Sequence, residues 1–318
     1  MQHDPGEIPY LFNAPDRERL GARRHDAAWL KAALADAGTR FVPVRGSDNA
    51  YLWDRGLPRA LLLDAVQAAP LLAAAHCVVL LGELGGRVHF ALGLDTAAVL
   101  PEAQYDDMRR VSALLDAGEL ALLGYARAMV HWHAQHRFCG HCGGVTASVR
   151  GGHERVCAAC GAHLFPRLDP AIIVLVTDGD RCLLGRQASW PKGRYSTIAG
   201  FVEHGETLEA AVEREVREET DVQVKDLYYQ SSQPWPYPGS LMLGFRATAT
   251  RTAIRCNDGE LEHAAWFSRG DIADSVDRGL MMPPSRSISY RLIKQWFEEE
   301  PGRDFSALHQ RDPNKAGR

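Results

Sequence analysis

The segment from Gly200 to Val222, GFVEHGETLEAAVEREVREETDV, constrains this chain more than any other. Glu215, Glu218 and Glu219 stand at relative positions 0, +3 and +4, which share one face of a helix. Like charges repel at that spacing, so a helix with a purely structural role would usually avoid them. A divalent cation reverses the argument, because Mg²⁺ or Mn²⁺ prefers carboxylate oxygens and leaves room for phosphate oxygens.

This pattern resembles the Nudix box, in which a glycine, a glutamate and an Arg-Glu pair precede two adjacent glutamates. The residues that match in identity and spacing are Gly200, Glu206, Arg214, Glu215, Val216, Glu218, Glu219 and Val222. Asp221 stands where the family has glycine, just past the helix end, and aspartate tolerates the left-handed conformation there at up to about 1 kcal/mol. The alternative is an ordinary acidic surface helix. Because Nudix enzymes hydrolyse a nucleoside diphosphate linked to another group X, the resemblance implies the reaction type but not X.

A second motif follows at residues 232–240, SQPWPYPGS, and resembles the SQPWPFPxS signature of NADH pyrophosphatases. Tyr237 replaces phenylalanine, which retains the ring and adds a hydroxyl. Three prolines in five residues exclude a helix interior or a central strand and predict a rigid loop, suited to positioning a flat ligand. The alternative is a proline-stiffened connection around a buried tryptophan. The matching residues are Ser232, Gln233, Pro234, Trp235, Pro236, Pro238 and Ser240.

Two CxxC motifs separated by fourteen residues precede both signatures. Paired motifs at this separation are typical of a zinc ribbon, in which four thiolates complete a tetrahedral shell and leave no open position. The predicted ligands of a structural Zn²⁺ are Cys139, Cys142, Cys157 and Cys160, with two disulfides as the alternative. The nearby His141, His153 and His163 are expected to be solvated or bonded to backbone groups.

The three signatures occur in the order of the NADH pyrophosphatase family, which implies the domain organisation. We expect a small N-terminal α/β domain over residues 1–130, related to Nudix and helping dimerisation, and a zinc ribbon over 135–166. A Nudix domain over 167–300 and a polar tail over 301–318 follow. Strands and helices mix without regular alternation, which favours an α+β fold, here a Nudix α/β/α sandwich with a mixed sheet. No internal repeat is visible.

Periodicity and turn residues place the elements. Helices are predicted over 25–37, 111–135, 207–220 and 288–297. Strands are predicted over 40–44, 171–177, 181–186, 197–202, 222–229, 241–248 and 264–267, with two more around a glycine-rich turn in 78–92.

Composition and the chain start argue against several partners. The net charge of −4 gives no basic bias for general nucleic-acid or membrane binding. The first residues lack the pattern of a signal peptide, and no apolar run approaches about 20 residues. Cys77, Cys182 and Cys256 are expected to be buried thiols, as in a reducing compartment. We therefore expect a cytoplasmic protein without a membrane partner.

The family resemblance implies the roles of the acidic residues. Glu215, Glu218 and Glu219 would be catalytic and hold Mg²⁺ or Mn²⁺, one of them doubling as general base. Glu206 and Arg214 would pair and, with Gly200, fix the shape of the loop before the helix. Glu260 aligns with a further family carboxylate that ligates metal, although it has no local signature and a solvated turn residue is the alternative.

Substrate contacts follow from the same resemblance. Phe201 and Phe165 could each stack on a flat ring, Phe165 across a dimer interface, or could pack in a core instead. Gln233, Trp235 and Ser240 are the expected contacts from the proline-rich motif.

The first functional hypothesis is hydrolysis of NADH or NAD⁺ to nicotinamide mononucleotide (NMN) and AMP by a homodimer. Family members also remove NAD caps from RNA 5′ ends, and Arg137, Arg150, Arg155 and Arg167 could contact the RNA phosphates or merely solvate the ribbon. The alternatives are another Nudix substrate, such as ADP-ribose, a diadenosine polyphosphate or a nucleoside triphosphate, and a non-catalytic nucleotide-binding zinc-ribbon module.

Overall fold

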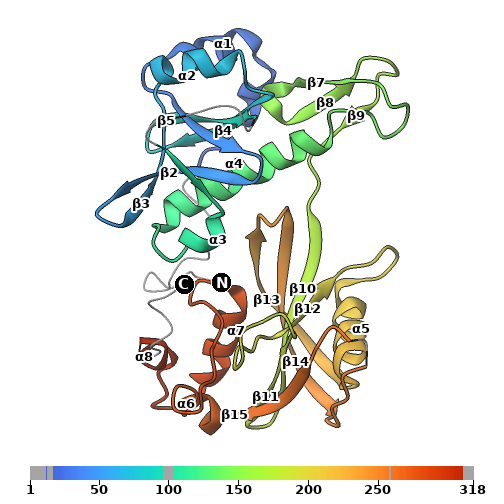
Figure 1. The fold of residues 1–318 in the computed structure, drawn as a ribbon. Coiled ribbons are helices and arrows are strands. Elements are labelled where there is room, and N and C mark those ends of the chain that lie inside the picture. Colours follow the sequence, from blue (N-terminus) through green and yellow to red (C-terminus); the bar gives the residue numbers. More distant parts are fainter. Residues whose placement is uncertain (1–11, 13–16, 96–99, 101–102, 258, 311–318) are drawn as a thin grey trace. The chain divides into compact units, whose positions relative to one another are not determined.

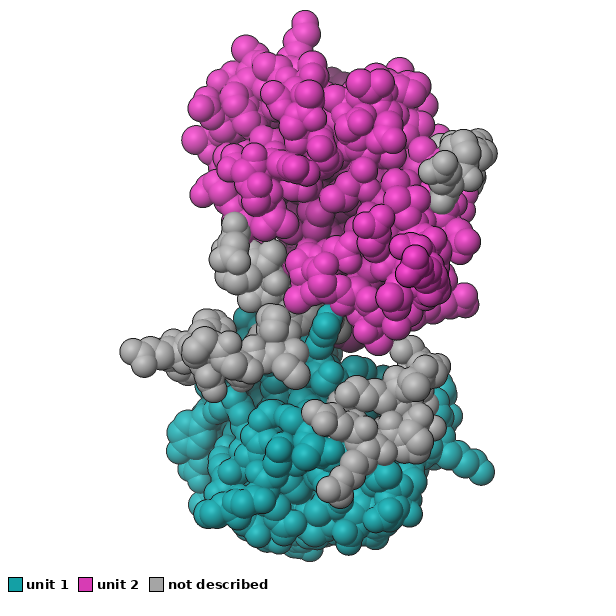
Figure 2. Space-filling view, turned by 90° about the vertical axis from the view of Figure 1, so that its left-hand side faces the viewer, with its two compact units in different colours: residues 1–11, 169–234, 240–318 teal, residues 12–168, 235–239 magenta. Residues whose placement is uncertain are grey.

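The computed structural model describes residues 12, 17–95, 100, 103–257 and 259–310 (Figure 1). The described residues divide into two compact units, coloured separately in Figure 2. Unit 1 comprises residues 169–234 and 240–310, and unit 2 comprises residues 12–168 and 235–239. The cut at 168/169 lies close to the predicted start of the Nudix domain, whereas the N-terminal domain and the ribbon form one unit rather than two.

Unit 1 is built on a six-stranded mixed sheet with the order β13-β14-β10-β11-β15, and β12 pairs with β10. β10 runs parallel to β14 and antiparallel to β11 and β12. The strands are β10 (Asp169–Asp178), β11 (Arg181–Arg186), β12 (Ile198–Phe201), β13 (Gln223–Trp235), β14 (Ser240–Arg251) and β15 (His263–Ser268).

The apolar run of β10 explains the layers of unit 1. Ile172, Val174 and Val176 join the core beneath α5 (Leu208–Thr220), whereas Ile173 and Leu175 face the opposite core beneath α7 (Ile288–Phe297). Alternate side chains of a strand point to opposite faces, so one central strand serves both cores. The predicted α/β/α sandwich with a mixed sheet is therefore confirmed (Figure 1).

Helix α5 begins and ends as its sequence requires. The Thr207 side chain accepts a hydrogen bond from the Ala210 N–H at 3.2 Å, which makes it the N-cap. Asp221 ends the helix with φ 58° and ψ 5°, the left-handed conformation expected for the position at which the Nudix pattern has glycine.

The sheet of unit 2 has the order β3-β2-β1-β5-β4, with β6 on β2. Its strands are β1 (Arg40–Arg45), β2 (Asp48–Asp54), β3 (Leu57–Ala60), β4 (Cys77–Leu84), β5 (Arg87–Leu94) and β6 (Gln104–Asp106). Helices α1 (Ala27–Ala35) and α2 (Ala65–Leu72) lie on one side of this sheet and α4 (Ala117–Gln135) on the other (Figure 1). The short α3 (Met108–Val111) precedes α4.

The two sheets repeat one topology. In unit 2, β1 and β5 form a parallel pair, and each also pairs with a strand adjacent in sequence, β2 or β4. In unit 1, β10 and β14 form the parallel pair, with β11 and β13 as the outer partners. Helix α2 precedes β4 as α5 precedes β13, but its sequence, AVQAAPLL, contains no carboxylate. No repeat is visible in the sequence because the repeat lies in strand order and not in residue identity.

The ribbon strands β7 (Thr146–Val149), β8 (Glu154–Cys157) and β9 (His163–Leu164) pack onto the rest of unit 2. His153 Nε2 donates to the Leu80 carbonyl at 2.7 Å, and His133 Nε2 donates to the Gly152 carbonyl at 2.8 Å. These bonds tie the segment between β7 and β8 to β4 and α4, which explains why the ribbon is not a separate body.

Three sequence expectations need correction. Cys256 was expected to be a buried thiol, like Cys77 and Cys182, but it is exposed. Residues 305–310 of the predicted polar tail form α8 (Phe305–Gln310), and Phe305 is buried beside Tyr290 and Phe297; residues 311–318 lie outside the described part. The loop predicted from residue 232 begins later, because β13 continues to Trp235. β13 is an edge strand, where a proline removes no ladder hydrogen bond.

Candidate functional site

Helix α5 presents the three glutamates in different environments. Glu219 is buried, with 3% of its surface exposed. The Glu215 side chain is 12% exposed and that of Glu218 is 49% exposed. The exposure of the predicted ligands therefore increases from Glu219 through Glu215 to Glu218.

Gly200 on β12 is required by its contact with α5. A Cβ atom at this position would lie 1.9 Å from the Glu215 carboxyl carbon and 2.0 Å from its Oε1. No side chain fits there while Glu215 keeps this position. The first glycine of the motif thus makes room for the carboxylate that comes fifteen residues later in the sequence.

Arg214 holds the loop before α5 to the helix. Its Nη2 and Nε donate to the two carboxylate oxygens of Glu206 at 2.7 and 3.0 Å, and Nη2 also donates to the Phe201 carbonyl at 2.9 Å. Its Nη1 donates to Glu215 at 2.9 Å and to Glu218 at 3.1 Å. The guanidinium lowers the pKa of Glu206 to about 2, and the predicted pair is present as a bidentate contact.

The charge of Glu260 affects the pKa of Glu215. Burial raises the pKa of Glu215, Arg214 opposes that rise, and the negative charges of Glu260 and Glu218 add to it. Glu260 lies in the segment before β15, and an effect on Glu215 requires it to be near α5. Glu260, which the sequence assigned only by alignment with the family, remains a predicted ligand whose charge acts on Glu215.

A divalent cation fits the chemistry of these side chains, since they offer several carboxylates, one of which is buried. In the described conformation, however, Arg214 bonds Glu215 and Glu218. Among the residues that the structure describes, the four ribbon cysteines form the only cluster of three or more ligand atoms that all lie within 4.8 Å of one another. The glutamates therefore remain predicted ligands.

The ribbon cysteines match a zinc site in chemistry and spacing. The Sγ atoms of Cys139 and Cys160 are 3.8 Å apart, and those of Cys142 and Cys157 are 3.5 Å apart. Zn–S bonds of about 2.3 Å in a tetrahedron place sulfur atoms about 3.8 Å apart. Backbone N–H groups of Cys160 and Ala159 lower the pKa of Cys157 to about 6, which favours the thiolate that zinc binds. The four thiols are a structural zinc site.

Comparison with known proteins extends these observations over the chain. Residues 167–290 match the NUDIX domain, residues 134–165 the NADH pyrophosphatase zinc ribbon domain, and residues 36–132 the NADH pyrophosphatase-like rudimentary NUDIX domain. The chain is 42% identical over 299 residues to the NAD-capped RNA hydrolase NudC of Pseudomonas aeruginosa, covering 93% of this chain and 96% of that protein. It belongs to the NADH pyrophosphatase family of Nudix proteins.

Other relatives of this Nudix protein are longer. The NAD-capped RNA hydrolase NUDT12 of Macaca fascicularis is 41% identical over 233 residues, which cover 67% of this chain and 50% of that protein. The human mitochondrial NAD(P)H pyrophosphatase NUDT13 is 39% identical over 214 residues, covering 63% of this chain and 61% of that protein. This chain thus spans about half the length of NUDT12. The rudimentary NUDIX match agrees with the repeated topology, and the absence of carboxylates from α2 agrees with its being rudimentary.

The predicted substrate contacts fall in both units. Phe201 in unit 1 is 61% exposed, directly after Gly200. Phe165 in unit 2 is 53% exposed and stacks at 6.5 Å on His163. Both aromatic rings are therefore exposed, each in its own unit, and both remain predicted substrate contacts.

The proline-rich motif contributes structure rather than open contacts. Gln233 has no exposed surface; its Nε2 donates to the Arg286 carbonyl at 2.9 Å, and its Oε1 accepts from the Ile288 N–H at 2.8 Å. Trp235 belongs to unit 2, where its ring meets Phe12 at 6.1 Å, and Ser240 is 5% exposed at the start of β14. Gln233 thus holds the first turn of α7, where the sequence predicted a substrate contact.

One polar cluster of the Nudix unit was not predicted. The hydroxyl of Ser289 on α7 bonds the Ser196 hydroxyl at 2.9 Å, accepts from the Thr197 hydroxyl at 2.9 Å, and accepts from the Thr197 N–H at 3.2 Å. These bonds fix the segment that enters β12 and hence Gly200. A serine within an apolar helical pattern was the available signal, but nothing in the sequence pairs it with residues about ninety positions away.

Two of the four arginines expected near RNA phosphates are held by other side chains of the protein. Arg155 is 6% exposed, and its nitrogens donate hydrogen bonds to Thr146 and to His133. Burial lowers the pKa of His133 to about 4. Arg150 pairs with Glu154 at 2.8 Å.

Among the described residues, no helix combines the length and the apolar character that a membrane span requires.

Proposed function

We propose that the chain is a metal-dependent diphosphatase that hydrolyses NADH and NAD⁺ to NMN and AMP. One observation carries the proposal: α5 presents Glu215, Glu218 and Glu219 beside the glycine that accommodates the first of them. The name of the Pseudomonas aeruginosa relative, which matches nearly the whole chain, supports an NAD-linked substrate.

The acidic residues have separate tasks in this reaction. Glu215, Glu218, Glu219 and Glu260 would hold Mg²⁺ or Mn²⁺, which when bound neutralises pyrophosphate charge and acidifies a water molecule. One carboxylate of α5 takes the proton of the water that attacks phosphorus, and the P–O bond to the other nucleotide breaks. Arg214 and Glu206 keep the loop and the helix in register.

Phe201 is the best placed of the proposed substrate contacts in unit 1. Its ring is exposed, while its carbonyl is held by Arg214 at 2.9 Å, so the backbone beneath the ring is fixed. Stacking on a base is worth about 1–3 kcal/mol, enough to select a flat ring but not to separate NADH from NAD⁺.

The test is steady-state hydrolysis of NADH with Mn²⁺ by Glu219→Gln, beside Glu213→Gln as the matched control. Glu213 is exposed on the same helix, so its change should leave turnover unchanged, whereas Glu219→Gln should lose at least about 100-fold. Mass spectrometry of the products in H₂¹⁸O shows which phosphorus accepts water. Undiminished turnover of Glu219→Gln would refute the assignment of Glu219 as a metal ligand. Faster hydrolysis of ADP-ribose or a diadenosine polyphosphate than of NADH would show that NADH is not the preferred substrate.

A second substrate is favoured by the names of two relatives, both NAD-capped RNA hydrolases. The bond broken in an NAD cap is the one broken in NADH, so the same carboxylates would serve. Release of NMN from NAD-capped RNA by the wild type, and its loss in Glu219→Gln, tests this activity. An NADH-active enzyme that releases no NMN from capped RNA would exclude it.

We also infer that the protein is a cytoplasmic homodimer. Four large apolar side chains of the ribbon and the residues after it are more than half exposed, and a second copy would cover them. They are Phe138, Val145, Phe165 and Leu168. Sedimentation of the wild type and of Val145→Asp tests the dimer, and a monomeric wild type at micromolar concentration contradicts it.

A further inference from the structure

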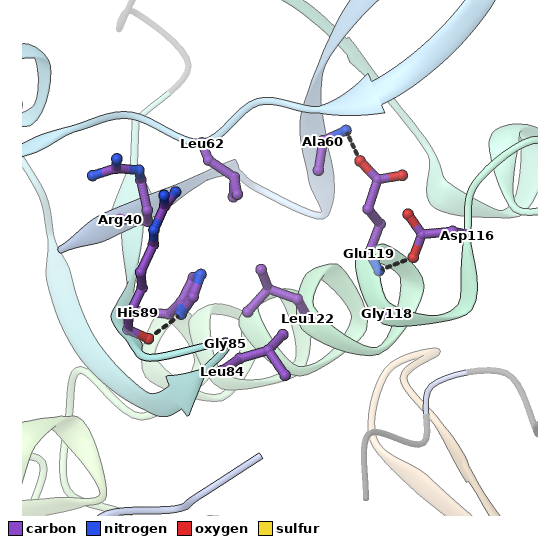
Figure 3. A pocket seen from close by; sticks show the side chains of 11 residues that line it. Arg40, Ala60, Leu62, Leu84, Gly85, His89, Asp116, Gly118, Glu119 and Leu122 are labelled. Carbon is purple, nitrogen blue, oxygen red and sulfur yellow. Dashed lines mark hydrogen bonds between the residues drawn. The ribbon is translucent and has the colours of Figure 1, made fainter. Parts of the chain in front are cut away.

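Unit 2 contains a cavity of about 340 Å³ that is separate from the α5 carboxylates (Figure 3). Strands β1, β4 and β5 and the first turns of α4 surround it. Its volume is at the lower end of the roughly 300–1,000 Å³ typical of small-molecule sites.

The walls of the cavity differ in chemistry from end to end. Figure 3 shows Arg40 and His89 at one end and Asp116 and Glu119 at the other. Side chains of Leu62, Leu84 and Leu122 lie between the two ends. A ligand that matches these walls has an anionic end, an apolar or flat middle, and hydrogen-bond donors at the far end.

His89 supplies a buried acceptor. It is 5% exposed, and its Nδ1 donates to the Arg87 carbonyl at 2.8 Å, because a carbonyl can only accept. Burial lowers the pKa of His89, and the charges of Arg17, Arg40 and Arg87 add to the effect. The neutral ring therefore presents Nε2 as an acceptor, and this atom has no hydrogen-bond partner within the described part of the chain.

The basic end lacks counter-charges. Arg40 donates from Nη1 to the carbonyls of Ala37 and Thr39, and neither Arg40 nor Arg87 forms an ion pair with a described carboxylate. The neighbouring Arg17 is 8% exposed, and its Nε and Nη2 have no partner among the described residues. Guanidinium groups without carboxylates attract phosphate.

The acidic end accepts hydrogen bonds. Glu119 Oε1 accepts from the Ala60 N–H at 2.9 Å, and Asp116 caps α4 by accepting from the Glu119 N–H at 2.8 Å. The side chains of Asp116 and Glu119 also interact with each other, and a hydrogen-bond donor from a ligand would offset the repulsion between the two carboxylates. An amino group or a carboxamide is a suitable donor.

We propose that this cavity is a second nucleotide site that binds a nucleoside monophosphate. The phosphate lies at Arg40 and Arg87, a ribose hydroxyl donates to His89 Nε2, the base lies on the leucines, and its amino or amide group donates to Glu119. AMP and NMN both have these parts. That they are also the products of this chain rests on the proposed function, and the cavity would then let product bind outside the α5 site.

Hydrogen–deuterium exchange of the full chain with AMP, NMN, adenosine or inorganic phosphate tests the site directly. AMP or NMN should slow exchange at the amides of residues 84–89 and 116–122, and adenosine and inorganic phosphate should do so less. Equal protection by inorganic phosphate would reduce the cavity to an anion site and overturn the nucleotide assignment. No protection by either nucleotide at millimolar concentration would overturn the proposal altogether.

Substitutions of the lining residues test whether the nucleotide binds in this cavity. Arg87→Glu should abolish this protection and lower the AMP stoichiometry in calorimetry by one, whereas Arg59→Glu is a matched charge reversal on β3, outside the lining. Leu62→Trp should block binding by filling the space without a change of charge. Equal losses in Arg59→Glu and Arg87→Glu would contradict a specific site. If AMP binds in the cavity but the protein does not cleave NADH, only the proposed function is refuted. If the protein cleaves NADH but AMP does not bind in the cavity, only the second nucleotide site is refuted.

Discussion

The contact between Gly200 and Glu215 gives a prediction whose size follows from the structure. In Gly200→Ala the new Cβ would lie 1.9 Å from the Glu215 carboxyl carbon, whereas ordinary contacts begin at 3.4 Å, so the carboxylate must move by about 1.5 Å. Metal–ligand distances tolerate only about 0.2 Å. Because the Arg214 bond at 2.9 Å must also change, we expect Mn²⁺ affinity to fall about 10–100-fold.

The assay for this variant separates binding from turnover. The electron paramagnetic resonance signal of free Mn²⁺ reports affinity, and NADH hydrolysis at saturating Mn²⁺ reports the remaining loss in kcat. Gly270→Ala is the matched control, because its Cβ would meet only Ser268 Oγ at 3.5 Å, an ordinary contact in the same unit. Unchanged Mn²⁺ affinity and turnover in Gly200→Ala would refute the claim that the position of Glu215 sets the metal site.

Three further predictions concern stability. Folding lowers the pKa of Glu206 from 4.5 to about 2, so the stability that its charge contributes is present above pH 4.5 and lost as the pH falls towards 2; thermal unfolding of Glu206→Gln should show a shallower acid dependence than the wild type. In urea unfolding, Asp221→Gly should raise the free energy of unfolding by up to about 1 kcal/mol, because glycine adopts the positive φ without strain. Loss of the exposed ion pair to Arg251 reduces this gain. Asp221→Ala should be less stable than Asp221→Gly. The Tyr237 hydroxyl is buried without a partner in the described residues, so Tyr237→Phe should raise the free energy of unfolding by up to about 1 kcal/mol, and a loss would reveal a missing partner such as bound water.

The sequence predicted the Nudix unit well because its signals are local. A short apolar run such as residues 171–176 is typical of a central strand. A threonine cap with a glutamate-rich helix sets the bounds of α5 within a residue or two. The pairing of Arg214 with Glu206 was also predicted, but from the family resemblance and not from the spacing of the two residues.

What the sequence missed depends on long-range contacts. The end of β13 reads as a loop because its prolines exclude a central strand, yet the strand lies at the edge of its sheet. Gln233 looks like a polar ligand contact until the partner backbone at Arg286 and Ile288, more than fifty residues away, is known. The cavity of unit 2 joins residues from 40 to 122 in positions that carry no motif at all.

The edge strand β13 also bears on association between copies of the protein at high concentration. Among the described residues, β13 pairs with β14 alone, and an edge strand of this kind can pair with a strand of another molecule, the first step of β-type aggregation. Lys225 and Asp226 place charges on this edge, the positive φ of Asp226 bends it, and Pro234 removes a donor near its end. Pro234, which makes the motif look unlike a strand, therefore also helps to keep other chains from extending the sheet.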